Sequence, residues 1–334
     1  MAAPAVEFEL RSPPTDGISA VQFGSSTDNL LVSSWDKTCR VYDAVGNRLV
    51  HAHPQASSAL CAVFSAEDDS RYVCGLVDGS VVEVDIERAA PTALASHAAG
   101  AKSVVAMKQT IISGGWDRQL FVHDRRSRQS AVDRADLPGK VYVIADAGHH
   151  LLLVATSDRH VLLYDARALS AGPTQVRQSS LKHQTRAAAC APTRDHYVVS
   201  SIEGRVAVEY IDPDPAVQAN KYAFKCHRGT GPDGRSCVYP VNAIAFHPVH
   251  GTFATGGDDQ TVNIWDGQGR KRIRQLPPYT TSVSALAFSR HGNYLAVASS
   301  YTYSEGERDH PPDAVFIRSI DANDVLPKSK RVRD

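Results

Sequence analysis

Fourteen histidines and six cysteines give this chain many side chains that could bind a metal or act in catalysis. Protein zinc sites draw three or four such ligands from short, regular spacings. The closest histidine groups, His149-His150 and His247-Pro-Val-His250, have no cysteine or carboxylate partners at ligand spacing. Ser179-Ser-Leu-Lys182 matches a Ser-x-x-Lys motif, but two matched residues have little specificity. The sequence shows no nucleophile elbow or paired-carboxylate pattern, so it predicts no metal, no cofactor and no enzyme.

Two tryptophans suit the binding of another protein. Trp35 and Trp116 each stand directly before the aspartate of a predicted tight turn. A large aromatic side chain at an exposed turn is a common anchor for a partner, because it offers much apolar contact area. The alternative is that each tryptophan only covers its own hairpin. We expect both to anchor a partner peptide.

Basic side chains gather in the second half of the chain. The connection 211–240 is much longer than a usual loop and contains Lys225 and Arg228, while Arg186 precedes it in an apparent strand. The charged N–H donors of arginine and lysine suit carboxylate and phosphate groups. The alternative is an ordinary solvated loop. These three residues are therefore candidates for binding an acidic or phosphorylated peptide.

A repeated phrase predicts the elements that hold these residues. It consists of a turn acid, alternating apolar residues, and a closing residue seven positions after the acid. The closing residues of the six copies lie 42, 39, 41, 45 and 56 positions apart. The turn acids are Asp36, Asp78, Asp117, Asp158, Glu203 and Asp259. A period near forty, with a hairpin turn followed by a strand of period two, is typical of WD-repeat β-propeller blades.

The strand patterns predict an all-β, seven-bladed WD-repeat propeller. A seventh set of strands runs to Ile320, but only a polar segment follows it, so this blade lacks an outer strand of its own. The alternating stretch Val6–Leu10 is predicted to supply that strand and to close the ring; the alternative is a frayed N-terminal arm. The predicted domains are a propeller over 1–320 and a flexible polar C-terminal tail over 321–334.

Blade geometry also predicts where the candidate residues lie. The turn between the second and third strands has the same orientation in every blade, so Trp35 and Trp116 should share one face, together with the connection 211–240. WD-repeat blades often place a histidine where it bonds the turn aspartate. His53 and His97 are the candidates for this structural role, with Asp78 and Asp117 as their acceptors.

Composition limits the class of partner and the compartment. Thirty-six Lys and Arg residues balance 36 Asp and Glu residues, which gives no case for direct nucleic-acid binding or for a membrane surface. No apolar run approaches the roughly 18 residues that span a bilayer. The six cysteines form no C-x-x-C pair and are expected to be reduced thiols in a cytosolic or nuclear protein. A basic run, Lys328–Arg333, is a possible nuclear-import signal.

Several long runs of the sequence resemble one family of mitotic-checkpoint WD-repeat proteins, called "budding uninhibited by benzimidazole, member three". The resemblance spans nearly the whole chain and is most specific from Ser179 onward; residues 72–85 depart from the family pattern. It is carried by SSLKHQTR, SSIEGRVAVEYIDP, KYAFKCHR, YPVNAIAFHPVHGTFATGGDDQTVNIWD, LAVASSYTYSEGE, PDAVFIRS and, in the first unit, LVSSWDKTCRVYD.

The resemblance implies a non-enzymatic adaptor of the spindle assembly checkpoint. Such proteins bind the GLEBS segment of checkpoint kinases and their kinase-like relatives, and dock on a kinetochore scaffold by reading its phosphorylated MELT repeats. By position, Trp35 and Trp116 would pack against the GLEBS segment and Arg186 would pair with its acidic residues. Lys225 and Arg228 would bind the phosphothreonine. The implied state is a monomeric propeller within hetero-complexes, located in the nucleus and at mitotic kinetochores.

A sister WD-repeat family that works in mRNA export at the nuclear pore shares some of these runs. It also binds a GLEBS segment, in that case from a nucleoporin, and is the alternative. The phrases YPVNAI, VNIWD and PDAVFIRS resemble the checkpoint family more closely.

Overall fold

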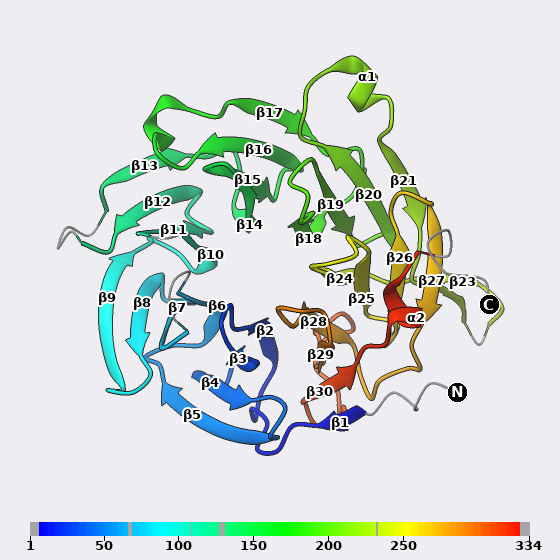
Figure 1. Ribbon diagram of the computed structural model, residues 1–334, viewed down its shortest axis with the longest axis horizontal. Helices are drawn as coiled ribbons and strands as arrows, with labels where there is room; N and C mark the ends of the chain where they lie inside the picture. The colour runs from blue at the N-terminus through cyan, green and yellow to red at the C-terminus, as the bar shows by residue number, and fades with distance from the viewer. Residues whose placement is uncertain (1–6, 66–68, 108, 127–130, 232, 328–334) are drawn as a thin grey trace.

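The computed structural model describes residues 7–65, 69–107, 109–126, 131–231 and 233–327. Over these residues the chain forms a ring of sheets around a central axis (Figure 1). The described strands form seven four-stranded antiparallel sheets and one two-stranded hairpin. The predicted all-β, seven-bladed propeller is confirmed.

Each blade runs from an inner strand beside the axis to an outer strand at the rim (Figure 1). Blades 1 to 3 consist of β2 (Ile18–Phe23), β3 (Asn29–Ser34), β4 (Thr38–Asp43) and β5 (Arg48–Pro54); β6 (Ala59–Phe64), β7 (Arg71–Leu76), β8 (Ser80–Asp85) and β9 (Ala90–Ser96); β10 (Ala101–Met107), β11 (Thr110–Gly115), β12 (Gln119–Asp124) and β13 (Asp133–Asp136). Blades 4 and 5 consist of β14 (Val141–Gly148), β15 (Leu151–Thr156), β16 (His160–Asp165) and β17 (Gln175–Gln178); β18 (Thr185–Cys190), β19 (His196–Ser201), β20 (Arg205–Tyr210) and β21 (Tyr222–Lys225).

The last two blades complete the ring. They consist of β24 (Val241–Phe246), β25 (Phe253–Gly257), β26 (Val262–Asp266) and β27 (Lys271–Gln275); β28 (Val283–Phe288), β29 (Tyr294–Ser299), β30 (Ala314–Ser319) and β1 (Glu7–Glu9). The remaining elements are the hairpin β22 (Arg228–Thr230) and β23 (Ser236–Val238), a 3-10 turn at Leu169–Ala171, and the short helices α1 (Pro215–Gln218) and α2 (Ala322–Val325).

The repeated phrase specifies the turn between the second and third strands. In blade 1 the carboxylate of Asp36 accepts the N–H of Thr38 at 2.8 Å, which closes the turn locally. The intervening residue, Lys37, adopts a positive φ of 66°. The residue after the turn acid has a positive φ in all six copies: Lys37, Gly79, Arg118, Arg159, Gly204 and Gln260. The acid therefore fixes the hairpin geometry and the register of the strand that follows it.

Apolar clusters and hydrogen bonds between neighbouring blades hold the ring together. The second strand of each blade is buried over nearly its whole length, and the largest cluster spans the junction of blades 7 and 1. Ser19 Oγ of blade 1 donates to the Ala59 carbonyl of blade 2 at 2.7 Å. The Ile18 N–H of blade 1 donates to Ser300 Oγ of blade 7 at 2.8 Å. The inner strand of blade 1 is thus bonded to both neighbouring blades, including blade 7 across the point where the ring closes.

The N-terminal strand closes the ring, as predicted. β1 pairs antiparallel with β30, and Glu7 lies opposite Arg318. Their side chains form an ion pair at 2.7 Å. Leu10, just after β1, is 1% exposed in the apolar cluster between blades 7 and 1. Val6, which the prediction included, lies outside the described residues.

The packed part of the chain extends beyond the predicted boundary at residue 320. α2 lies against blade 6, where Thr252 Oγ1 donates to the Val325 carbonyl at 2.9 Å. Asp324 is fully buried in an ion pair with Arg274, and Val325 is 1% exposed. Residues 321–327 therefore belong to the folded body, whereas 328–334, including the basic run, lie outside the described residues.

In two blades of the described part, a histidine that follows the outer strand of the preceding blade bonds the turn aspartate, as is typical of WD repeats. The expected pair in blade 3 is present, with His97 Nδ1 at 3.0 Å from Asp117 Oδ1. In blade 6, which the sequence analysis did not identify, His227 Nδ1 lies 2.7 Å from Asp259 Oδ1. The expectation for His53 was wrong: this side chain stacks on His51 in the outer strand of blade 1, with ring centroids 5.9 Å apart.

Candidate partner-binding face

Two glycines fix the orientation of the two tryptophans predicted to bind a partner. The backbone N–H of Trp35 donates to the Gly17 carbonyl, and the backbone N–H of Trp116 donates to the Gly100 carbonyl, both at 2.8 Å. Each indole then lies over its glycine. A Cβ at Gly17 would sit 3.3 Å from Trp35 Cδ1, and one at Gly100 only 2.8 Å from Trp116 Cε3. Glycine at the start of the inner strand thus makes room for each tryptophan.

The structure brings three of the five predicted residues to one cavity. Trp35, Trp116 and Arg186 line a space of roughly 810 Å³ that is bordered by residues of several inner strands. Trp35 is 43% exposed, and Trp116 is half-buried. We call the face that carries this cavity the Trp face. Because both tryptophans line this one cavity, the prediction that they share a face is confirmed.

The cavity carries an excess of positive charge. Arg186, Lys102 and Lys140 line it, and Asp16 is the single lining carboxylate among the described residues. Burial lowers the pKa of Arg186, and Asp258 partly offsets this effect. Burial also lowers the pKa of Lys102, with a further contribution from the charge of Arg186. Removing these cations from water is unfavourable, so an acidic ligand that neutralises them gains more than it would at an open surface.

Sequence reasoning missed several residues of this cavity. Lys102 and Tyr142 lie near the start of inner strands, and Tyr301 and Tyr303 come from the long loop between β29 and β30. Lys102 follows the buried Ala101 at a register shift between Ala101 and Ser103, where the inner strand β10 does not alternate. The period-two pattern therefore gives no signal for Lys102. The two tyrosines of the loop carry no signal either, because an irregular loop has no periodicity.

Lys225 and Arg228 do not line the cavity and lie further out on the Trp face. Lys225 ends β21 opposite Arg205, and both predicted residues are exposed. Arg228 Nη2 donates to the Glu203 carbonyl at 2.9 Å. The Glu203 carboxylate lies 3.6 Å from the guanidinium of Arg205. Arg205, Lys225 and Arg228, which we call the outer basic group, therefore gather beside the Glu203 turn at the outer end of blade 5.

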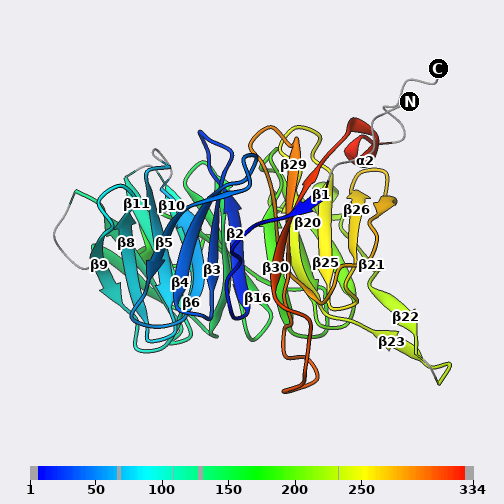
Figure 2. The same ribbon diagram turned by 90° about the horizontal axis from the view of Figure 1, so that it is seen from below.

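The connection 211–240 lies only partly on the Trp face. Its first part crosses from β20 to β21 through α1 on the opposite face, because β20 starts at the Glu203 turn on the Trp face and ends at the other side. β21 then returns as the outer strand of blade 5, which the sequence analysis had read as connection. The β22–β23 hairpin leaves the disc on the same side as the β29–β30 loop (Figure 2).

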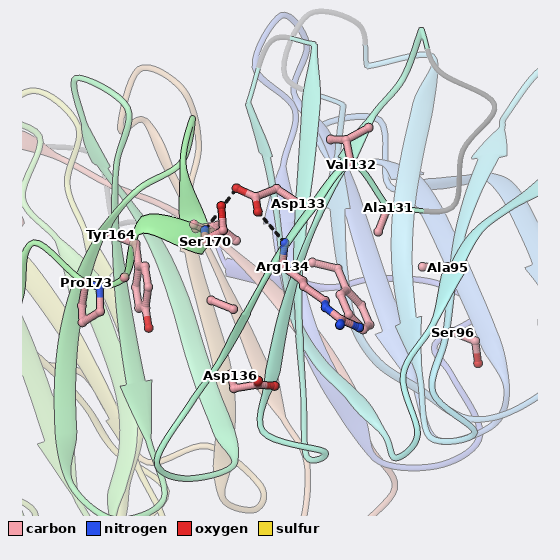
Figure 3. Close-up of a pocket in the computed structure, with 14 residues that line it drawn as sticks. Ala95, Ser96, Ala131, Val132, Asp133, Arg134, Asp136, Tyr164, Ser170 and Pro173 are labelled. Atoms are coloured by element: carbon pink, nitrogen blue, oxygen red, sulfur yellow. Dashed lines mark hydrogen bonds between the residues drawn. The ribbon is translucent and has the colours of Figure 1, made fainter.

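A second cavity lies at the rim, away from all five predicted residues. It has a volume of about 850 Å³ and borders the outer strand of blade 3 (Figure 3). Asp133 Oδ2 accepts the N–H of Ser170 at 3.3 Å across it. The described residues contain no group of three His, Cys, Asp or Glu that could hold a metal ion. Among the helices of the described part, none is long and apolar enough to cross a membrane.

Comparisons with known proteins agree with this architecture. The model of the WD domain, G-beta repeat family matches residues 7–43, 231–266 and 270–302. "Structure of U3-55K" shares the fold with a TM-score of 0.79 at 15% identity, and the match covers 94% of this chain and 98% of that one. At that identity the likeness shows the fold alone.

The sequence relatives are similar enough to indicate a family as well as a fold. The chain is 45% identical to "Mitotic checkpoint protein BUB3.1" of Arabidopsis thaliana, over 98% of this chain and 96% of the relative. It is 43% identical to "Mitotic checkpoint protein bub3" of Dictyostelium discoideum, over 96% of both. It is also 31% identical to "Poly(A)+ RNA export protein" of Schizosaccharomyces pombe, over 98% of this chain and 94% of the relative.

Proposed function

Since this chain belongs to the Bub3 family of WD-repeat mitotic checkpoint proteins, we propose that it is a non-catalytic adaptor that joins two partners on its Trp face. Its relatives support a role in the spindle assembly checkpoint. In the proposal, the cavity binds a GLEBS segment of a checkpoint kinase or kinase-like relative. The outer basic group binds phosphorylated MELT repeats of a kinetochore scaffold.

The observation that carries the first part is the single cavity lined by Trp35, Trp116 and Arg186. Two aromatic surfaces beside a desolvated guanidinium suit a peptide that combines apolar and acidic side chains. GLEBS peptide binding should therefore protect the exposed Trp35 ring from solvent. We expect a blue shift of tryptophan emission and reduced acrylamide quenching when peptide is added, and neither change in a Trp35→Phe, Trp116→Phe variant.

The second part is supported by the position of Lys225 and Arg228 at the outer end of blade 5. Lys225→Glu or Arg228→Glu should weaken the binding of a phosphorylated MELT peptide by about tenfold or more, because a charge-assisted hydrogen bond is replaced by repulsion. Arg235→Glu is the matched control. The Arg235 side chain is 86% exposed, between β22 and β23, and this substitution makes the same change in charge. Equal losses for phosphorylated and unphosphorylated peptide would contradict the assignment.

The proposal also assigns the protein to the nucleus and to kinetochores in mitosis. A fluorescent fusion should label kinetochores in cells with unattached chromosomes. The mRNA-export alternative rests on the more distant export relative and predicts a nuclear-rim signal without kinetochore labelling. The location of the fusion protein therefore distinguishes the checkpoint function from the mRNA-export function.

A further inference from the structure

The loop between β29 and β30 has an anchored base and an open tip. Thr302 Oγ1 donates to Asp258 Oδ1 at 2.6 Å, and the Tyr301 N–H donates to Asp313 Oδ1 at 3.2 Å. Residues 303–309 form an unbroken run of exposed residues without regular structure. The loop stands away from the disc (Figure 2). An enzyme can therefore reach this tip without opening a blade.

The tip contains a serine followed by regularly spaced acids. Glu305, Glu307 and Asp309 stand one, three and five positions after Ser304. Arg308 lies within this run and pairs with Glu305, so the run holds three acids and one base. This acidic excess complements the basic substrate groove of an acid-directed protein kinase.

Five other serines of the described part have an acid three positions on: Ser25, Ser33, Ser65, Ser80 and Ser200. Ser33, Ser65 and Ser200 are at most 1% exposed, Ser80 lies within β8, and Ser25 Oγ donates to Asp69 Oδ1 at 3.1 Å. Among these six, Ser304 is the exposed serine that has acids at all three of the positions one, three and five residues on.

The loop that holds Ser304 is bonded to a carboxylate whose charge acts on the cavity arginine. Thr302, two residues before Ser304, donates its hydroxyl to Asp258 Oδ1 at 2.6 Å. Burial lowers the pKa of Arg186, and the charge of Asp258 raises it against this lowering. Asn242 Oδ1 accepts from Arg186 Nε at 3.1 Å and from Nη2 at 2.8 Å. A charge added to this loop therefore lies close to the arginine assigned to the acidic partner.

We propose that Ser304 is a phosphorylation site for an acid-directed Ser/Thr protein kinase, and that its phosphate weakens partner binding at Arg186. This inference rests on the proposed function of the cavity. Ser304 Oγ forms a bond to the γ-phosphorus of ATP, the bond from that phosphorus to the leaving oxygen of ADP breaks, and the hydroxyl proton passes to the kinase base. The phosphate adds nearly two negative charges beside Asp258. These charges compete with the carboxylates of the partner for Arg186.

The site is tested on the full chain with casein kinase 2 and ATP, followed by phosphopeptide mapping. Phosphate should appear at Ser304 and be absent from that peptide in Ser304→Ala. Glu307→Gln removes one acid from the recognition pattern without touching a blade, so it should lower the rate of incorporation several-fold. A chain that carries no phosphate at Ser304 after exhaustive reaction contradicts the inference.

The effect on the cavity is tested by titrating a GLEBS peptide into unmodified, phosphorylated and Ser304→Ala protein. Phosphorylation should weaken binding by about tenfold, as expected for one added unfavourable charge interaction at a partly buried site. Ser304→Ala should stay within about twofold of the unmodified protein. Equal affinity of the phosphorylated and unmodified chains overturns the inference and leaves the proposed function standing. Failure of the unmodified chain to bind overturns the proposed function itself.

Discussion

At the scale of single residues, one residue type has two distinct uses in this chain. Trp265 stands six positions after its turn acid and is packed between two blades: its Nε1 donates to Thr255 Oγ1 of blade 6 at 2.9 Å, and its ring packs on Phe224 of blade 5. Trp35 stands one position before its turn acid and is 43% exposed at the cavity. Position relative to the turn acid therefore separates a packing tryptophan from a candidate binding tryptophan.

The histidines show how far sequence reasoning reaches at this scale. His97 was identified correctly because it stands directly before a regular inner-strand pattern. The prediction for His53 was wrong because Gln55, two residues later, occupies the position before blade 2. The side-chain amide of Gln55 donates to the Tyr72 hydroxyl of that blade. His227 was overlooked because its surroundings were read as one long connection, whereas it follows the outer strand β21 directly. Because the sequence analysis did not recognise β21 as a strand, it also did not recognise the hydrogen bonds of His227 to Asp259 and Thr255.

His247 makes a prediction for the pH dependence of stability. It is 3% exposed, and its Nδ1 accepts the N–H groups of Val249 and His250 at 3.2 and 3.1 Å. Burial, with a contribution from His250, lowers the pKa of His247 to about 4. An unfolded histidine titrates near pH 6.5, so the unfolded state binds more protons between pH 6.5 and 4. The contribution of His247 to the free energy of unfolding is complete above pH 6.5 and is lost as the pH falls toward 4.

His247→Asn tests this prediction, because an asparagine oxygen keeps an acceptor in place of Nδ1 but does not titrate. We expect a variant that is about 1–3 kcal/mol less stable at pH 7.5, owing to lost packing. Its stability should fall less than that of the parent between pH 6.5 and 4.5. Urea unfolding at several pH values measures both. If the unfolding free energies of both proteins fell equally with pH, His247 would not contribute to the pH dependence of stability.

At the scale of elements, the regular blades were predictable and the departures from them were only partly so. The β1 strand was predicted because its alternation matched a missing partner in blade 7. The helix α2 was not, because its burial depends on Arg274, which lies about fifty residues earlier in β27. Short elements that dock through one remote ion pair leave no local pattern in the sequence.

The closure of the ring by β1 gives a stability prediction. Leu10→Ala removes a side chain that is 1% exposed between blades 7 and 1, and should cost about 2–5 kcal/mol of unfolding free energy. Val176→Ala is the matched control, because Val176 on the outer strand β17 is 60% exposed and should change stability by less than about 0.5 kcal/mol. Chemical denaturation compares the two. Equal, small effects would mean that the N-terminal segment does not hold the ring closed.

At the scale of the whole molecule, the propeller is a rigid support whose Trp face carries the distinctive features. The net charge of the chain is zero, yet the cavity gathers Lys102, Lys140 and Arg186. The β22–β23 hairpin and the β29–β30 loop extend the same side of the disc (Figure 2). The sequence predicted the fold and three of the cavity residues. It did not predict that inner-strand and loop residues complete the cavity, since this depends on how seven blades converge on one axis.

The central claim is that the two exposed-turn tryptophans bind a GLEBS segment while Trp265 serves the fold. The most direct measurement is calorimetric titration of a GLEBS peptide into the parent, into a Trp35→Ala, Trp116→Ala variant and into Trp265→Phe, with a thermal melt of each. The double variant should lose about a hundredfold or more in affinity, the expected cost of two aromatic anchors, and keep most of its thermal stability. Trp265→Phe should melt earlier and bind as the parent does. Affinity of the double variant within about threefold of the parent would contradict the account.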